Sequence, residues 1–123
     1  MNGNKLIVDS NILIFWLQGN KDATQFLSQN EIYLSFISEL EILSLPVLSS
    51  KEILRIKNFL QKYFIIDIND FVKESTLELR RKYLIQLPDA IILATALFLD
   101  LPFVTADKRL FKIKEVKIIR FII

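Results

Sequence analysis

The stretch LIVDSNILI, residues 6–14, places a single carboxylate between two aliphatic runs. The apolar run at residues 5–8 predicts a short buried parallel strand, and the apolar pattern then resumes as a helix that starts at Ser10 or Asn11. Asp9 therefore lies at the carboxyl end of a strand. There it either caps the following helix or holds a charged ligand.

The rest of the chain alternates predicted strands and helices. We expect further strands at residues 31–35, 64–67, 102–107 and 117–123, and further helices at residues 21–29, 37–46, 49–63, 69–85 and 87–100. This alternation predicts an α/β fold with a parallel central sheet and helices on both faces. The chain shows no repeat, low-complexity tract or linker, so residues 1–123 are expected to form a single domain.

The composition restricts the possible chemistry. The chain has 123 residues, of which 52% are apolar and 24% charged, as in a globular protein. It has no cysteine and no histidine, which excludes disulfides, thiolate metal sites and histidine-activated nucleophiles. Chemistry near pH 7 then depends on carboxylates, with a hard metal ion bound through oxygen. The net charge of +2 is too small to indicate nucleic-acid binding by itself.

The sequence also indicates where in the cell the protein is expected. The N-terminus lacks the basic stretch and long apolar segment of a secretion signal. The longest apolar-rich run, residues 90–99, is too short to span a bilayer. Together with the absence of cysteine, this predicts a soluble cytoplasmic protein without a membrane partner.

Four acidic residues stand out because of their neighbours: Asp9, Glu41, Asp89 and Asp107. Asp9 and Asp107 follow predicted strands, and ligands of open parallel sheets bind beyond the carboxyl ends of the strands. Clustered carboxylates repel one another, and in a chain without histidine only a cation compensates them. Mg²⁺ or Mn²⁺ is the expected ion, since both accept carboxylate and water oxygens.

Each of these residues also has a purely structural interpretation. Asp9 is suited to cap a helix, and Asp89 is suited to the first turn of one. Glu41 could face solvent, in which case Glu39 is the competing candidate, and Asp107 could be an ordinary turn residue. The functional interpretation has the advantage that it explains all four positions at once.

The segments IVDSNILI, ISELEILS, LPDAIILATAL and FVTADKRLF, in this order and spacing, resemble the PIN-domain family, in particular VapC-type toxins. The resemblance covers nearly the whole chain. It implies a parallel α/β fold and a metal-dependent endoribonuclease that hydrolyses RNA. It also implies a homodimer, and an antitoxin protein that covers the active-site groove. Whether such a nuclease acts as a toxin or as a housekeeping enzyme stays open at this point.

The resemblance also implies roles for individual residues. The family's acidic positions match Asp9, Glu41, Asp89 and Asp107, and its supporting polar positions match Ser10, Asn11 and Thr105. The sequence departs from the family pattern after the glutamate, where many such toxins have a glycine and this chain has EILSLP. The chain must therefore turn in another way at residues 44–46.

Basic residues offer contacts for a phosphate backbone. Residues 108–120 hold six basic residues and one acidic residue, and Arg80, Arg81 and Lys82 form a second basic run. Such runs are often simply solvated faces. If the acidic site binds RNA, its phosphates are expected to contact four residues, Arg80, Arg81, Lys108 and Arg109.

Two alternatives to the nuclease remain. A phosphotransfer fold with an aspartyl nucleophile at Asp9 lacks the second acidic residue that such patterns need, because position 11 is asparagine. A catalytically silent PIN-like module would bind only RNA or a protein partner. Apart from these alternatives, apolar residues such as Ile53, Ile56 and Phe59 are expected to be too numerous for one small core, which predicts exposed patches and a dimer.

Overall fold

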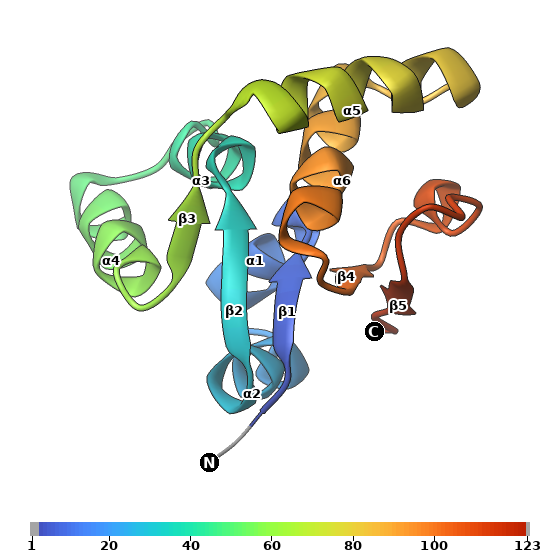
Figure 1. The fold of residues 1–123 in the computed structure, drawn as a ribbon. Helices are drawn as coiled ribbons and strands as arrows, with labels where there is room; N and C mark the ends of the chain where they lie inside the picture. Colours follow the sequence, from blue (N-terminus) through green and yellow to red (C-terminus); the bar gives the residue numbers. More distant parts are fainter. Residues whose placement is uncertain (1–2, 123) are drawn as a thin grey trace.

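Five parallel strands form one sheet in the order β3-β2-β1-β4-β5 in the computed structural model, which describes residues 3–122 (Figure 1). The strands are β1 (Lys5–Val8), β2 (Glu31–Ser35), β3 (Phe64–Ile66), β4 (Phe103–Thr105) and β5 (Ile118–Arg120). The helices are α1 (Ser10–Leu17), α2 (Lys21–Gln29), α3 (Phe36–Leu43), α4 (Ser50–Leu60), α5 (Asp70–Lys82) and α6 (Leu87–Leu99), with a 3₁₀ turn η1 (Lys108–Leu110).

The strand order creates one switch point. From β1 the chain extends the sheet in one direction through β2 and β3, and it later extends the sheet in the other direction through β4 and β5. β1 and β4 are therefore hydrogen-bonded neighbours that belong to opposite halves of the fold. Ligands of open α/β sheets bind beyond the carboxyl ends of the strands at such a point.

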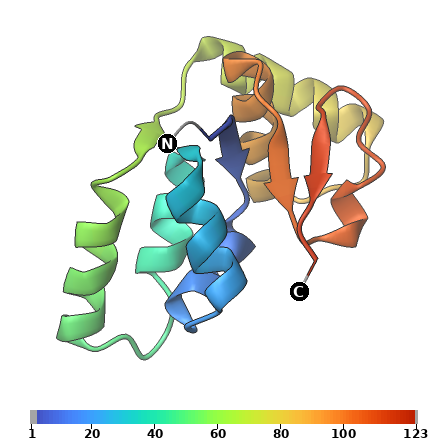
Figure 2. The ribbon, with the colours of Figure 1, turned by 90° about the horizontal axis from the view of Figure 1, so that it is seen from below.

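Helices cover both faces of the sheet, as the sequence predicted. Figure 2 shows α1, α2 and α4 on one side of the strands and α5 and α6 on the other. Alternate residues of β1 separate the two cores: Leu6 and Val8 pack against α1, α2 and α4, whereas Ile7 packs against α5 and α6. Both faces of β1 are thus buried, which explains its unbroken aliphatic sequence.

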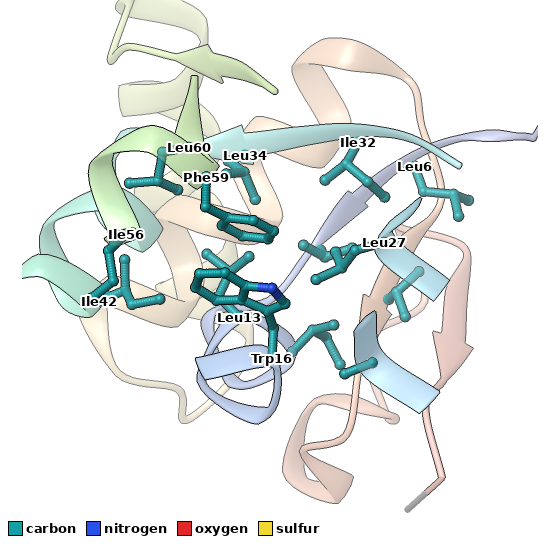
Figure 3. Close-up of a cluster of buried hydrophobic side chains, with 14 residues drawn as sticks. Leu6, Leu13, Trp16, Leu27, Ile32, Leu34, Ile42, Ile56, Phe59 and Leu60 are labelled. Carbon is teal, nitrogen blue, oxygen red and sulfur yellow. The ribbon is translucent and has the colours of Figure 1, made fainter. Parts of the chain in front are cut away.

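An aromatic stack fixes α4 against α1. The rings of Trp16 and Phe59 lie 3.5 Å apart between centroids at an interplanar angle of 12° (Figure 3). Ile56 is fully buried beside them, and Phe59 is 7% exposed. The expectation that Ile56 and Phe59 exceed the capacity of the core is therefore wrong, because α4 lays its apolar face on α1. Ile53 is half-buried.

Other side chains remain exposed instead. Phe71 on α5 and Phe98 on α6 are 50% and 46% exposed, and their ring centroids lie 5.8 Å apart. Phe64 on the edge strand β3 is 54% exposed. Exposed apolar surface is thus present, as predicted, but it is formed by other residues than Ile56 and Phe59.

The boundaries differ from the predicted ones at several ends. The helix expected at residues 37–46 begins at Phe36 and ends at Leu43, and the turn before α4 uses Val47 with a φ of 65°. The strand expected at residues 117–123 is confined to Ile118–Arg120, and position 123 lies outside the described residues. The turn η1 was not foreseen. Within residues 3–122, no helix has the length and apolar character needed to cross a membrane.

Candidate active site

Asp9 lies at the junction of β1 and α1 and makes two different contacts with its two carboxylate oxygens. Oδ1 accepts a hydrogen bond from the backbone N–H of Ser10 at 2.8 Å, and Asp9 is the N-cap of α1. Oδ2 accepts a hydrogen bond from the Thr105 hydroxyl at 2.7 Å. The side chain is 5% exposed. Capping and participation in a polar site therefore occur together at this residue.

Glu41 reaches the same region from α3. The Ser10 hydroxyl contacts Glu41 Oε1 at 2.5 Å and Ser38 Oγ at 2.9 Å. A hydroxyl has one proton and a carboxylate only accepts, so Ser10 donates to Glu41 and Ser38 donates to Ser10. The competing candidate, Glu39, lines a different hollow between α3 and α4.

Asp107 follows β4 and caps the turn η1. Its backbone N–H donates to the Thr105 hydroxyl at 3.0 Å, so Thr105 connects Asp107 to Asp9. The Asp107 carboxylate accepts from the guanidinium of Arg109 at 2.6–3.2 Å. This forked ion pair fixes the direction of the Asp107 side chain.

Asp89 lies in the first turn of α6, directly after Pro88. Pro88 is suited to this turn because the first helical positions need no backbone N–H. The side chain is half-buried. Burial and, to a smaller extent, the charge of Asp89 raise the pKa of Asp9, while the charges of Asp107 and Glu41 add to burial in raising the pKa of Asp89.

Burial dominates the electrostatics of the site. Burial raises the pKa of Asp9 to about 6, against the hydrogen bonds from Thr105 and Ser10 that lower it. Burial and then the nearby Asp107 raise the pKa of Asp89. The Arg109 guanidinium lowers the pKa of Asp107 below its ordinary range. Negative charge is therefore costly at Asp9 and Asp89, and a cation would relieve that cost.

Comparison with known proteins agrees with this architecture. The PIN domain family matches residues 6–116. The chain belongs to the PIN domain family. A chain of the toxin–antitoxin complex from Klebsiella pneumoniae is 32% identical at a TM-score of 0.81, over 90% of this chain and 94% of that chain. No curated protein sequence matches the chain.

Two more distant structures share the fold of this PIN domain. They are VapBC2 from Rickettsia felis bound to a DNA fragment from its promoter, with a TM-score of 0.79, and DNA-bound VapBC from Salmonella typhimurium, with a TM-score of 0.84. Their identities to this chain are 21% and 16%. The matches cover 95% and 94% of this chain, and 98% and 97% of those chains.

The donor set of this PIN domain fits a hard divalent cation. All four carboxylates offer oxygen, and Asn11 Oδ1 is a buried acceptor without a hydrogen-bond partner among the described residues. Asn11 Nδ2 lies 3.4 Å from both Asp9 Oδ2 and Thr105 Oγ1, which places this amide in the site. Within residues 3–122, however, no three acidic side chains already stand close enough together to hold a metal ion. The Asp107 carboxylate is held by its ion pair with Arg109, and the Glu41 carboxylate is held by its hydrogen bond with Ser10.

The predicted phosphate-binding residues separate into two groups. Arg80, Arg81 and Arg109 line one open hollow of about 580 Å³, which we call the arginine hollow; its remaining lining is Leu77, Tyr83, Leu84, Ile85, Gln86 and Leu87. Lys108 is exposed in η1 and does not line it. Lys82, from the same basic run, forms a 2.9 Å salt bridge to Glu115 instead.

Sequence reasoning missed Ser38. It is fully buried and bonded to Ser10, and it lies on the face of α3 that carries Glu41. The signal was present, because residues three apart on a helix are neighbours on one face. Serine three residues before an acidic residue is not by itself informative, however. Only the contacts of Ser10 with both Ser38 and Glu41 connect Ser38 to the candidate site.

Proposed function

We propose that this PIN domain, residues 1–123, is a metal-dependent endoribonuclease that hydrolyses RNA phosphodiester bonds. The observation that supports the proposal is the hydrogen-bond network at the switch point of the sheet, in which Ser10 contacts both Asp9 and Glu41 and Thr105 contacts both Asp9 and Asp107. Membership of the PIN domain family supports the same chemistry. Buried carboxyl groups with raised pKa values, as at Asp9 and Asp89, are typical of a functional site.

The four carboxylates are the proposed ligands of Mg²⁺ or Mn²⁺. When bound, such an ion activates water and stabilises negative charge on the phosphate oxygens. Thr105 and the Ser10 N–H hold the two oxygens of Asp9 in fixed directions, and Ser10 does the same for Glu41. Asn11 supplies a further oxygen acceptor beside Asp9.

We further propose that the protein is the toxin of a toxin–antitoxin pair and acts in the cytoplasm as a homodimer. The Klebsiella pneumoniae relative belongs to a toxin–antitoxin complex, and this chain covers 94% of its length. A cognate antitoxin protein is then the partner expected to cover the acidic site. A DNA-binding protein encoded beside the gene of this chain would support this role over that of a housekeeping nuclease.

The test of the enzyme is the variant Asp9→Asn, assayed for cleavage of a labelled single-stranded RNA in Mg²⁺ and in Mn²⁺. Asparagine keeps the shape and the helix cap but removes the charge, so folding should persist while cleavage falls by about a hundredfold or more. Asp22→Asn makes the same substitution at an exposed position in the first turn of α2 and should leave cleavage unchanged.

Two results would contradict the proposal. Equal cleavage by Asp9→Asn and the parent would reduce Asp9 to a helix cap. RNA binding without cleavage by the parent in either metal would favour the silent RNA-binding module. Calorimetric titration of Mn²⁺ into the parent and into Asp9→Asn separates the cases further, since only a catalytic centre requires metal binding that depends on Asp9.

A further inference from the structure

The arginine hollow combines cationic and apolar side chains. Arg80 and Arg81 come from the last turn of α5, and Arg109 comes from η1. Its wall carries Leu77, Leu84 and Leu87, which are 46%, 98% and 48% exposed. Leucines exposed to this extent indicate a surface that contacts something, because exposure of clustered apolar side chains is unfavourable.

The charge of the hollow is not neutralised from within. None of the residues that line it is acidic. Within residues 3–122, neither Arg80 nor Arg81 forms a salt bridge, whereas their neighbour Lys82 is paired with Glu115. The Arg80 Nε donates to the Ile85 carbonyl at 3.4 Å, which holds its guanidinium over the connection between α5 and α6. The hollow is therefore complementary to an anion.

The hollow adjoins the acidic site. Arg109 lines the hollow and at the same time pairs with Asp107, and the negative charges of Asp89 and Asp9 also act on it. Leu87, which also lines the hollow, begins α6 only two residues before Asp89. A polyanion whose phosphate lies at the four carboxylates would continue into this hollow with its next nucleotide.

We propose that the arginine hollow is a subsite for the nucleotide that neighbours the cleaved phosphodiester in single-stranded RNA. The proposal rests on the nuclease function proposed above. Arg81 and Arg109 contact the phosphate, and Leu84 and Leu87 cover one face of an unstacked base. Recognition of RNA through splayed bases on apolar side chains and guanidinium planes requires a single strand, because paired bases are not free to turn outward.

Three physical features favour RNA over a protein occupant. The hollow carries three cations, its lining has no carboxylate, and one of its cations, Arg109, also pairs with Asp107 of the acidic site. The outcomes below include a protein occupant, in particular a second copy of this chain.

The binding test uses the full chain with Asp9→Asn, which prevents cleavage during the measurement. Affinity for a fluorescent ten-nucleotide single-stranded RNA is measured by anisotropy across a salt series. Arg81→Gln should weaken binding about fivefold to tenfold and reduce the salt slope by about one unit. Leu84→Ser should weaken binding about threefold or more without changing the slope, because it removes an apolar contact and no charge. Neither change should alter affinity for duplex RNA as strongly.

A second hollow provides a matched control. A groove of about 500 Å³ between α1, α2 and α4 also combines basic side chains with an exposed leucine, and it is lined by Lys51 and by Leu54, which is 60% exposed. Lys51→Gln and Leu54→Ser make the same chemical changes away from the acidic site. They should leave RNA affinity and the salt slope within the error of the parent.

The outcomes separate this proposal from the nuclease function. If the parent cleaves RNA while Arg81→Gln and Leu84→Ser bind and cleave as the parent does, the subsite is wrong and the nuclease stands. If the parent binds RNA through these residues but never cleaves it, the hollow is an RNA-binding site without a neighbouring reaction, and both the nuclease and its subsite are wrong. Loss of RNA binding by the control variants to the same extent would contradict the subsite.

A protein occupant has its own signature. If Leu84→Ser converts a dimer into a monomer in light scattering and leaves RNA affinity unchanged, the hollow is a contact between copies and the proposal is wrong. In the otherwise unmodified chain, a subsite instead predicts that Leu84→Ser raises KM for RNA several-fold while kcat stays near that of the parent.

Discussion

Asp9 caps a helix and at the same time takes part in a buried polar cluster. Its Oδ1 caps α1 through the Ser10 N–H, while its Oδ2 accepts from Thr105 on the neighbouring strand β4. A carboxylate has two oxygens, so the cap and the site do not compete. The raised pKa of about 6 reports the cost of burying this charge between them.

Because burial raises the pKa of Asp9, the free energy of unfolding is expected to depend on pH when a chelator removes any metal ion. An aspartate with a folded pKa of about 6 and an unfolded pKa of 3.8 binds more protons when folded between these pH values. The free energy of unfolding should therefore fall as the pH rises from about 4 to 6. Urea unfolding should show this slope in the parent and a flatter profile in Asp9→Asn. By the same linkage, Asp9→Asn should be more stable than the parent at pH 7.5, by about 1–3 kcal/mol.

The opposite result would be informative. If Asp9→Asn is less stable than the parent at pH 7.5 in chelator, the ionised carboxylate contributes more through its hydrogen bonds than its burial costs. The cluster would then not need a cation to hold its charges.

Ser38 is a positioning residue for Glu41, acting through Ser10. Removing its hydroxyl leaves Ser10 without its donor and frees the Glu41 carboxylate to move, so Ser38→Ala should weaken Mn²⁺ binding by about tenfold. Calorimetry measures this affinity. Thr76→Val is the control, since it removes a buried hydroxyl that bonds only to a carbonyl within α5. Equal Mn²⁺ affinities of Ser38→Ala and the parent would show that Ser38 only fills space.

At the scale of elements, the connection between α3 and α4 contains a left-handed turn position that is not occupied by glycine. Val47 adopts a φ of 65°, a left-handed conformation that β-branched residues rarely take, and its side chain is 98% exposed. The backbone strain of this turn is local to Val47.

Glycine at this position should relieve the strain. Val47→Gly is expected to raise the free energy of unfolding by about 1 kcal/mol, since no contact is lost and the left-handed conformation becomes unstrained. Urea unfolding measures the change. Gly19 is the reciprocal control: its φ is 84° and no atom lies within 4 Å of an added Cβ, so Gly19→Ala should lower stability by a similar amount through the backbone alone. Unchanged stability of Val47→Gly would show that the turn bears no strain.

At the scale of the whole molecule, the exposed aromatic pair on α5 and α6 predicts self-association. Phe71 and Phe98 contact each other and remain half exposed, so a second copy that covers them would bury apolar surface. Light scattering at micromolar concentration should give twice the chain mass of 14.4 kDa. Phe71→Ser together with Phe98→Ser should shift the mass towards the monomer.

Leu84→Ser is the comparison for this experiment, because it removes an exposed apolar side chain from the arginine hollow and should leave the dimer intact. A parent chain that is monomeric at micromolar concentration would contradict the prediction. A monomeric Leu84→Ser variant would instead move the dimer contact to the hollow.

The sequence by itself determined the order of strands and helices, the parallel α/β fold and the acidic edge. Hydrophobic periodicity and capping residues are patterns of a few neighbouring positions, so β1, α1 and the buried helix α6 can be recognised from the sequence. Parallel strands bring their carboxyl ends to one edge, and this rule alone placed Asp9 and Asp107 there.

Only the tertiary structure decided which side chains meet. The contact of Thr105 with Asp9, the contact of Ser10 with Glu41 and the convergence of Arg81 with Arg109 join segments whose approach no local pattern encodes. The same holds for the burial of α4 against Trp16, which depends on two distant helices presenting complementary surfaces. Local sequence sets which elements form, whereas close packing of their faces in three dimensions sets which residues become a site.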